Sequence, residues 1–224
     1  MRILNVFLLC ALFLASCSKE SDTSIPVSPF VSIINTSPTL GTYLVYVNGA
    51  KVITSGLPFG GVIPYRQANT GDATFKFTTE SSTESVLTKT FPLAENTAYS
   101  LFLIGKDAQM DALLIKDNVG TTSTEKAFIR FINLVPDAPD FDLTLPAGDT
   151  LATKRGYKKA SEFIPVDPKT YSFSIKDNIT GAVKTTLADQ VLTVGKYYTV
   201  IARGLLNVSS EIQHPLSAQL IVHQ

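Results

Sequence analysis

The side chains that most often carry out catalysis are few in this sequence, and their positions are unfavourable. Its only histidines are His214 and His223, close to the end of the chain. Catalysis by a Ser-His-Asp or Cys-His set needs a histidine held beside the nucleophile. One histidine before Pro215 and one at the chain end are typical of a loop and a last strand instead. Two cysteines and two histidines also make a zinc site of the usual ligands unexpected. We therefore expect no enzymatic activity.

Three aspartates, Asp137, Asp140 and Asp142, are the best candidates for a metal or acid–base site. Hard oxygen ligands at this spacing could hold Ca²⁺, which takes about six to eight oxygens. Two carboxylates about 5 to 10 Å apart could hydrolyse a glycoside. However, Pro136 and Pro139 make the segment a turn, where aspartate is favoured because it accepts hydrogen bonds from nearby backbone amides. Turn capping, a calcium site and catalysis remain three interpretations, of which turn capping is the simplest.

A basic turn at Lys154, Arg155, Tyr157, Lys158 and Lys159 places four cations around one aromatic ring. Such a turn could contact anionic lipid headgroups, lipopolysaccharide phosphates or an acidic glycan, since each cation near a charged membrane contributes about 1 kcal/mol. The alternative is a solvated connection whose lysines protect a sheet edge.

An apolar segment, Gly56 to Tyr65, occupies the corresponding place earlier in the chain. Its large side chains, Leu57, Phe59 and Ile63 among them, are expected to fold back onto their own domain. If they were exposed instead, the patch would mark a site for a protein partner.

The amino terminus predicts a secreted, lipid-anchored protein. Residues 3–14 are apolar apart from Asn5, a run too short for a membrane-spanning helix, which needs about 20 residues, and typical of a secretion signal. The ending Leu14-Ala15-Ser16-Cys17 resembles the bacterial lipobox, in which cleavage falls between Ser16 and Cys17. We therefore expect a signal peptide over 1–16, acyl chains on Cys17 that insert in the membrane, and a flexible tether that ends at residue 29.

Two short motifs bear on where the protein resides. Ser18-Lys19-Glu20 resembles the export signals of surface lipoproteins in the Bacteroidota, which favours the cell surface over the periplasmic face of the outer membrane. Asp149-Thr150-Leu151 fits the short Asp-Ser/Thr-apolar pattern that is glycosylated in the same bacteria, so Thr150 is a candidate for O-glycosylation.

The composition excludes two further classes of protein. The 224 residues include 19 basic and 19 acidic side chains, whereas a nucleic-acid binder normally carries a basic excess. A hydrophobic content of 45% argues against a disordered chain. Since signal cleavage leaves one cysteine, which carries the lipid, the fold must rest on its core rather than on a disulfide.

Short runs of alternating apolar residues, separated by Gly, Pro, Asn and Asp, predict an all-β protein. In Ala73 to Thr78 the alternation places Phe75 and Phe77 toward a core and Lys76 toward water. The strands expected in the first half are 30–35, 43–47, 51–54, 62–65, 73–79, 86–91, 98–104 and 111–116.

An internal repeat divides the chain into two similar halves. Phe30 to Asn35 matches Phe128 to Asn133 at an offset of 98 positions, and the same offset pairs Tyr43 with Phe141. We expect one module over residues 30–119 and a second over 126–224, joined by a polar linker. Seven or so short strands in each half are typical of an antiparallel immunoglobulin-like β-sandwich.

The second half resembles a bacterial family of domains of unknown function, number four-three-nine-seven. The segment 131–142 has the family's apolar strand, asparagine, Pro-Asp-Ala-Pro turn and following aspartate, and 169–173 and 195–200 match its Gly-Thr-Tyr and Gly-x-x-Tyr-Thr strands. The first half departs from this pattern, because Ser37-Pro38-Thr39-Leu40 lacks Asp-Ala-Pro and Leu44 replaces the aspartate. The resemblance implies secreted or lipid-anchored immunoglobulin-like modules, often in tandem, and no particular activity.

Together these features predict a non-enzymatic, lipid-anchored protein of the cell envelope that acts as a binding, adhesion or scaffolding module. Its partner would be an envelope protein or a surface glycan, and no cofactor is expected apart from a conceivable Ca²⁺ ion. The alternative is a carbohydrate-binding accessory lipoprotein, which a row of exposed aromatic rings on one sheet face would favour.

Overall fold

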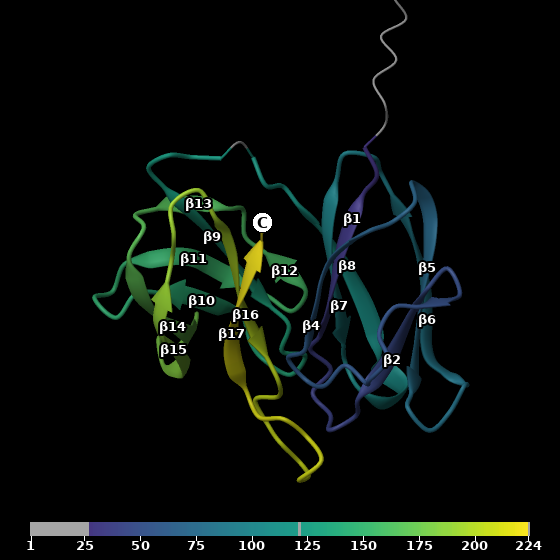
Figure 1. Ribbon diagram of the computed structural model, residues 1–224. Helices are drawn as coiled ribbons and strands as arrows, with labels where there is room; N and C mark the ends of the chain where they lie inside the picture. Colours follow the sequence, from purple (N-terminus) through teal and green to yellow (C-terminus); the bar gives the residue numbers. More distant parts are fainter. Residues whose placement is uncertain (1–26, 121, 224) are drawn as a thin grey trace, which may run out of the picture.

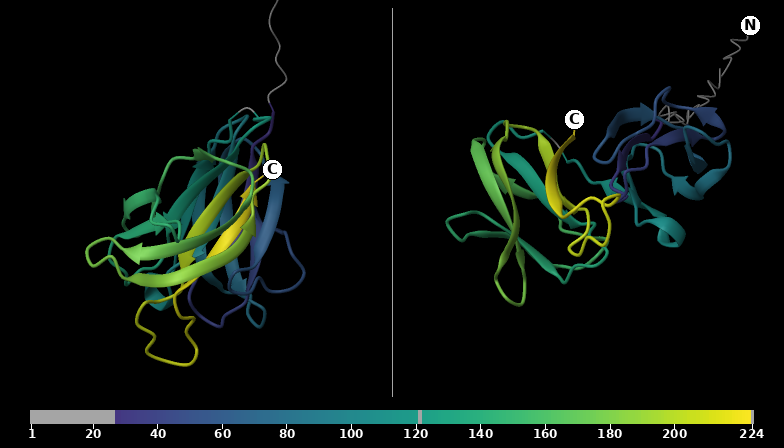
Figure 2. Two further views of the ribbon diagram at one scale, coloured as in Figure 1. Left: turned by 90° about the vertical axis from the view of Figure 1, so that its left-hand side faces the viewer. Right: turned by 90° about the horizontal axis from the view of Figure 1, so that it is seen from below.

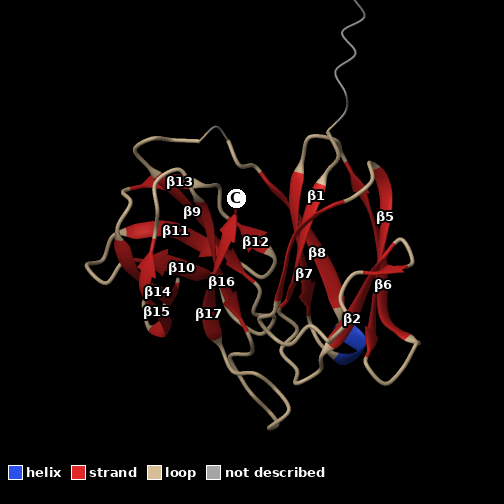
Figure 3. Cartoon of the chain, viewed as in Figure 1, coloured by secondary structure: helices blue, strands red, loops and turns tan. Residues whose placement is uncertain are grey.

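The computed structural model describes residues 27–120 and 122–223 (Figure 1). The predicted signal peptide, Cys17 and the tether up to residue 26 lie outside the described residues. Within them the chain is built from β-strands, with one short 3-10 turn at Asp107–Gln109 (Figure 3). The described part contains no helix that is long and apolar enough to cross a membrane. The all-β prediction is confirmed.

The first module is a sandwich of two four-stranded sheets. One sheet has the order β4 (Val62–Gln67), β1 (Phe30–Asn35), β7 (Ala98–Ile104) and β8 (Asp111–Asp117). The other has the order β3 (Ala50–Lys51), β2 (Tyr43–Val47), β5 (Gly71–Thr79) and β6 (Ser85–Leu93). As the alternation predicted, Phe75 and Phe77 of β5 are fully buried between the sheets.

The second module repeats this arrangement. One sheet contains β12 (Lys159–Ala160), β9 (Ala127–Asn133), β16 (Tyr197–Arg203) and β17 (Ser217–His223), with β13 (Ile164–Val166) also paired to β9. The other contains β11 (Thr150–Arg155), β10 (Phe141–Thr144), β14 (Thr170–Asp177) and β15 (Val183–Val191). The predicted tandem of immunoglobulin-like sandwiches is confirmed.

The sequence repeat is also a repeat of strand register. Strand β1 pairs in parallel with β7, and β9 pairs in parallel with β16, whereas the other strand pairs are antiparallel. Tyr46 lies opposite Lys76 across β2 and β5, and Thr144 lies opposite Ser174 across β10 and β14. A position in one module can therefore be compared directly with its counterpart in the other.

A third apolar cluster joins the two modules, in addition to one core inside each. It consists of Ile34, Phe102 and Ile104 from the first module and Ile132, Leu134, Ile201 and Ile221 from the second. Most of these side chains belong to β1, β7, β9, β16 and β17, so one sheet of each module packs against the other (Figure 2). Seven side chains with at most 4% exposure fix the modules side by side.

Candidate functional site

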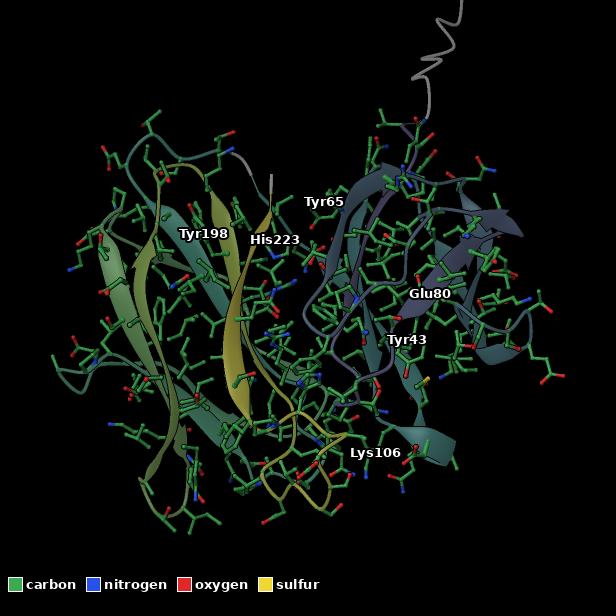
Figure 4. The ribbon with its side chains drawn as sticks, turned by 60° about the horizontal axis from the view of Figure 1, so that its bottom comes forward. Tyr43, Tyr65, Glu80, Lys106, Tyr198 and His223 are labelled. Carbon is green, nitrogen blue, oxygen red and sulfur yellow. The ribbon has the colours of Figure 1, made fainter. Side chains whose placement is uncertain are left out.

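A ring of polar side chains is buried where the two modules meet. Asp117, at the end of β8, forms a salt bridge with Arg130 of β9. The Asp117 carboxylate also accepts hydrogen bonds from Ser100 Oγ at 2.8 Å and from Tyr65 Oη at 2.6 Å. His223 Nδ1 of the second module lies 2.6 Å from Tyr65 Oη, and Figure 4 shows these two side chains between the modules. Asp117, Arg130, Ser100 and His223 are each at most 3% exposed.

The direction of the hydrogen bonds in this ring follows from counting protons. Tyr65 has one hydroxyl proton, which it donates to Asp117, so His223 Nδ1 must carry a proton and donate it to Tyr65 Oη. On the other side, Thr199 Oγ1 accepts from Arg130 Nε at 2.8 Å and lies 2.6 Å from His223 Nε2. The threonine therefore donates to Nε2, and His223 is held as a neutral imidazole.

The electrostatics agree with this assignment. Burial lowers the pKa of His223 to about 4, which leaves the ring uncharged at neutral pH. Burial, together with the nearby Asp117 carboxylate, raises the pKa of Tyr65. The Ser100 hydroxyl is bonded to the carboxylate, and the Thr199 hydroxyl, which contacts the imidazole, is fully buried. The ring joins the two modules through buried polar contacts.

The sequence predicted the elements on which the two histidines lie, but it did not predict the side chains that contact His223. His214 lies in the loop between β16 and β17, and His223 lies on the last strand, as predicted. Asp117 was assigned no role in the predicted module 30–119, yet it ends β8 and is 3% exposed. The one available signal was Arg130, a charge within the apolar run of β9, since a charge on a buried strand requires a partner.

Phe59 makes a second contact between the modules. Its ring stacks on His214 with 4.0 Å between the ring centroids, and the Arg203 guanidinium lies 4.2 Å from the Phe59 centroid. Leu57 and Ile63 pack into their own module as predicted, with 6% and 4% exposure. Phe59 differs from the prediction, because its ring contacts an aromatic ring and a cation of the second module.

The three aspartates of the predicted calcium site have separate roles. Asp137 accepts from two consecutive backbone amides of the loop after β16, at 2.8 and 2.7 Å. Asp142 accepts from the backbone amide of Lys154 at 2.7 Å, and the backbone carbonyl of Asp140 accepts from another main-chain amide. Among the described residues no three Asp, Glu, His or Cys side chains converge as metal ligands would. The Asp137 and Asp142 carboxylates thus cap backbone amides, but these amides are 12 to 70 residues away rather than the neighbouring ones that turn capping predicts.

Part of the predicted basic turn belongs to the junction between modules. Lys158 Nζ donates to Asp111 Oδ2 at 2.9 Å, and Lys89 pairs with the same carboxylate. Partial burial alone would raise the pKa of Asp111, but the two lysines outweigh it and lower the pKa to about 2. Tyr157 packs against the cluster between the modules, where burial raises its pKa to about 12. These two residues face the first module rather than an open surface.

The remaining residues of that turn are differently placed. Arg155 ends β11 and donates from Nη1 to the carbonyl of Ala160 at 3.3 Å. Lys154 and Lys159 are exposed, and Thr150, the candidate for glycosylation, is exposed at the start of β11. The four cations therefore do not form one continuous patch around Tyr157.

An exposed apolar groove lies at the end of the molecule toward which β1 and β7 run. We call it the distal groove, and it is lined by Thr39, Leu40, Gly41, Tyr43, Thr79, Val86, Asp107, Met110 and Ile212. Its volume is about 580 Å³. Leu40 and Ile212 are 58% and 64% exposed, although the backbone amide of Leu40 donates to the carbonyl of Ile212 at 3.1 Å. The groove thus combines residues of both modules. The loops that follow β1 and β16 lie at the end of the molecule opposite to the start of β1 (Figure 1).

The outer face of the sheet β3-β2-β5-β6 carries one row of side chains that differs sharply between the modules. The row runs Lys51, Tyr46, Lys76, Thr88 across the four strands, and Lys76 Nζ lies 5.5 Å from the Tyr46 ring centroid. The register-equivalent row in the second module is Thr150, Thr144, Ser174, Thr186. Since hydroxyl side chains suffice for the same strand pairing, the lysines and tyrosine are not needed for the fold.

These features define a tandem β-sandwich protein in which two similar modules are packed through a buried apolar and polar junction. The chain belongs to the family described as Domain of unknown function (DUF4397), whose model matches residues 29–144 and 127–216. The two overlapping matches correspond to the two modules. The expected family membership is confirmed for both halves, including the first, which lacks the Asp-Ala-Pro turn.

Three solved structures show a distant likeness to this chain. An alpha-glucan-recognising family 41 carbohydrate-binding module of streptococcal virulence factors is 12% identical, with a TM-score of 0.25, and the match covers 78% of this chain and 93% of that one. A family 26 module of Eubacterium rectale Amy13K, solved with maltoheptaose, is 9% identical, with a TM-score of 0.28 and coverage of 87% and 97%. A proposed cell adhesion protein from Bacteroides eggerthii is 10% identical, with a TM-score of 0.26 and coverage of 89% and 96%. No curated protein matches the sequence. At these TM-scores the likenesses carry no argument about function.

Proposed function

We propose that this protein is a non-enzymatic, lipid-anchored module of the cell envelope that binds a protein partner through the distal groove, in adhesion or in scaffolding. The observation that carries the proposal is the exposure of Leu40 and Ile212 side by side on two different modules. Two apolar side chains exposed next to each other in a hollow offer a surface where an apolar side chain of a partner can be removed from water. An apolar side chain of the partner would fill it.

The junction between the modules supports the same proposal. The loops that line the groove come from both modules, so their spacing depends on the buried ring around Asp117 and on the contact of Phe59 with His214. Loops held by a rigid scaffold lose little conformational freedom on binding. A preformed groove is therefore expected to bind with a smaller entropic cost than two independent domains would.

Photo-crosslinking in growing cells tests the groove. A photoreactive amino acid is placed at Leu40, and at Ile179 as the matched control. Ile179 is an apolar residue that is 84% exposed in the second module and does not line the groove. We expect one discrete protein adduct from position 40 and none from position 179. Adducts of equal yield from both positions, or none from either, would contradict the proposed binding site.

Anchoring and location are tested separately. The Cys17→Ser variant should leave the membrane fraction and lose incorporation of a labelled fatty acid, because acyl chains are attached to that thiol. Protease treatment of intact cells, with a periplasmic protein as the leakage control, should degrade the wild-type modules if they face outward. Protection until lysis would contradict surface exposure and assign the modules to the periplasm.

A second candidate function is binding of an acidic glycan by the outer face of the first module. Tyr46 offers a ring and Lys51 and Lys76 offer cations on either side of it, a set that suits a sugar ring with carboxylate groups. Replacing both lysines by the hydroxyl residues of the second module, Lys51→Thr and Lys76→Ser, should remove retention on an acidic polysaccharide gel. Lys169→Ser is the matched control, because Lys169 lies over the buried Tyr171 ring. Equal loss in both proteins would contradict this assignment.

A further inference from the structure

The core of the first module contains a cavity that opens to the surface. Its volume is about 240 Å³, and it lies at the side of the sandwich where β3 and β4 are the edge strands. It is lined by Val31, Ile33, Val47, Val52, Arg66, Gln67, Ala68 and Phe75. Phe75 and Ile33 are 0% and 2% exposed, so the cavity reaches the centre of the core. A dry apolar cavity of about 150 Å³ already binds benzene in another protein.

The second module shows that the fold does not require this space. Strand pairing aligns Val31 with Ile129, since they lie opposite Arg66 and Ile164 on the neighbouring strands. The apolar lining residues Val31, Ile33, Val47, Val52 and Ala68 correspond to Ile129, Phe131, Leu145, Leu151 and Val166. Each of these five positions has a larger side chain in the second module, and all five larger residues contribute to its core.

The edge strand beside the cavity is also shorter in the first module than in the second. Strand β3 has two residues, whereas the corresponding β11 has six and covers more of the open side. An unfilled cavity lowers stability, because its lining loses contacts. The five smaller side chains and the shorter strand all enlarge the same space in the first module, and the second module shows that the fold does not require this space.

The mouth of the cavity carries a cation where the second module has an apolar residue. Arg66 replaces the counterpart Ile164, and its Nη1 donates to the carbonyl of Val52 at the rim. The other guanidinium N–H groups make no hydrogen bond within the described residues and remain open to an acceptor. A second depression of about 510 Å³ shares Val52 and Arg66 with the cavity, which leaves room for a polar head group outside it.

We propose that the first module binds a small carboxylic acid with an alkyl chain. The chain occupies the cavity between the sheets, and the carboxylate pairs with the Arg66 guanidinium, whose planar N–H groups match the two carboxylate oxygens. This site lies in one module only and is separate from the distal groove, so it does not depend on the proposed partner.

The test is a calorimetric titration of the Cys17→Ser chain, which keeps every described residue, with linear carboxylic acids from butanoate to decanoate. Each methylene that enters the cavity should lower Kd by about fourfold, and the gain should stop at the chain length that fills the space. Decanol, which lacks the carboxylate, tests whether the charge contributes to binding. A lysophosphatidic acid with the same alkyl chain tests whether the site binds an envelope lipid instead of a free acid. Binding of decanol as tight as that of decanoate, or of the phospholipid alone, would overturn the assignment of a free acid.

Three variants complete the test. Ile33→Phe introduces the residue that the second module carries at this position and should abolish binding of the acid. Ala68→Val also introduces the residue of the second module but adds less volume, so it serves as the second filling variant if Ile33→Phe does not fold. Arg66→Gln should raise the Kd of decanoate at least tenfold and leave the Kd of decanol unchanged. Val183→Ile, a change of one methylene at a residue that is 52% exposed, is the control. Undiminished binding in a folded filling variant, or no binding of any acid by the parent chain, would overturn the proposal.

Discussion

Replacing Asp117 by alanine is the most direct perturbation of the junction between the modules. The substitution removes the carboxylate that Arg130 pairs with, and Arg130 is 3% exposed. It also removes the acceptor of the hydroxyl groups of Ser100 and Tyr65. The variant therefore keeps a buried guanidinium charge without a counter-charge and two hydroxyl groups without their partner.

The expected loss is large relative to the stability of such a protein. Breaking a buried ion pair by removing one partner costs about 3–5 kcal/mol, and each hydroxyl left without an acceptor adds up to about 1–3 kcal/mol unless water reaches it. With the ion-pair loss as the main contribution, we expect a loss of about 4 kcal/mol in the free energy of unfolding. A domain of this size has a total of about 5–15 kcal/mol.

Urea unfolding followed by circular dichroism measures this loss. The control is Asp167→Ala, because Asp167 pairs with Lys126 at 2.7 Å on the surface with 66% of its side chain exposed. Solvent screens an exposed pair, so this control should change the free energy of unfolding little. The double variant Asp117→Leu with Arg130→Met should recover most of the loss, because it leaves no unpaired charge. If Asp117→Ala and Asp167→Ala cost the same, the ring does not join the modules and the reasoning fails.

Three further predictions concern pH, ring stacking and the capped loop. The pKa of His223 is about 4 in the folded protein and about 6.5 in the unfolded chain. Between these two pH values the unfolded chain therefore binds more protons than the folded protein. The free energy of unfolding should fall by about 3 kcal/mol as the pH is lowered from 6.5 toward 4. His223→Gln should flatten that part of the curve of urea midpoint against pH, and an unchanged curve would contradict the shift. Phe59→Ala should lower the free energy of unfolding in urea by about 2 kcal/mol, since it removes a stacked ring and a cation–π contact. A loss below about 0.5 kcal/mol would contradict a stabilising role of these two contacts. Asp137→Ala should speed hydrogen exchange at the amides of Leu206 and Asn207, while calcium leaves the Tm of the wild type unchanged; a calcium-dependent rise in Tm that this variant loses would restore the metal interpretation.

Local patterns were sufficient to predict the strands. The bounds of β1, β2 and β7 coincide with the predicted segments 30–35, 43–47 and 98–104, because strand alternation has a period of two residues and is interrupted by residues with turn preferences. The edges were less accurate: the strand predicted at 51–54 is only Ala50–Lys51, since few pairing partners hold an edge strand. Asp137 does lie in a turn, but its carboxylate accepts from amides 69 and 70 residues away and not from the neighbouring amides that local turn preferences predict.

By itself, the sequence determined the all-β class, the two-fold repeat and the family, because each of these depends on residue types at short or constant spacing. The tertiary structure alone decided that Tyr65 meets His223 across 158 positions, that Phe59 stacks on His214, and that Ile33 borders a cavity where Phe131 fills a core. Contacts of this kind depend on how two finished sandwiches pack and on the volume left between sheets. No local pattern encodes those quantities, since they arise only when distant side chains compete for the same space.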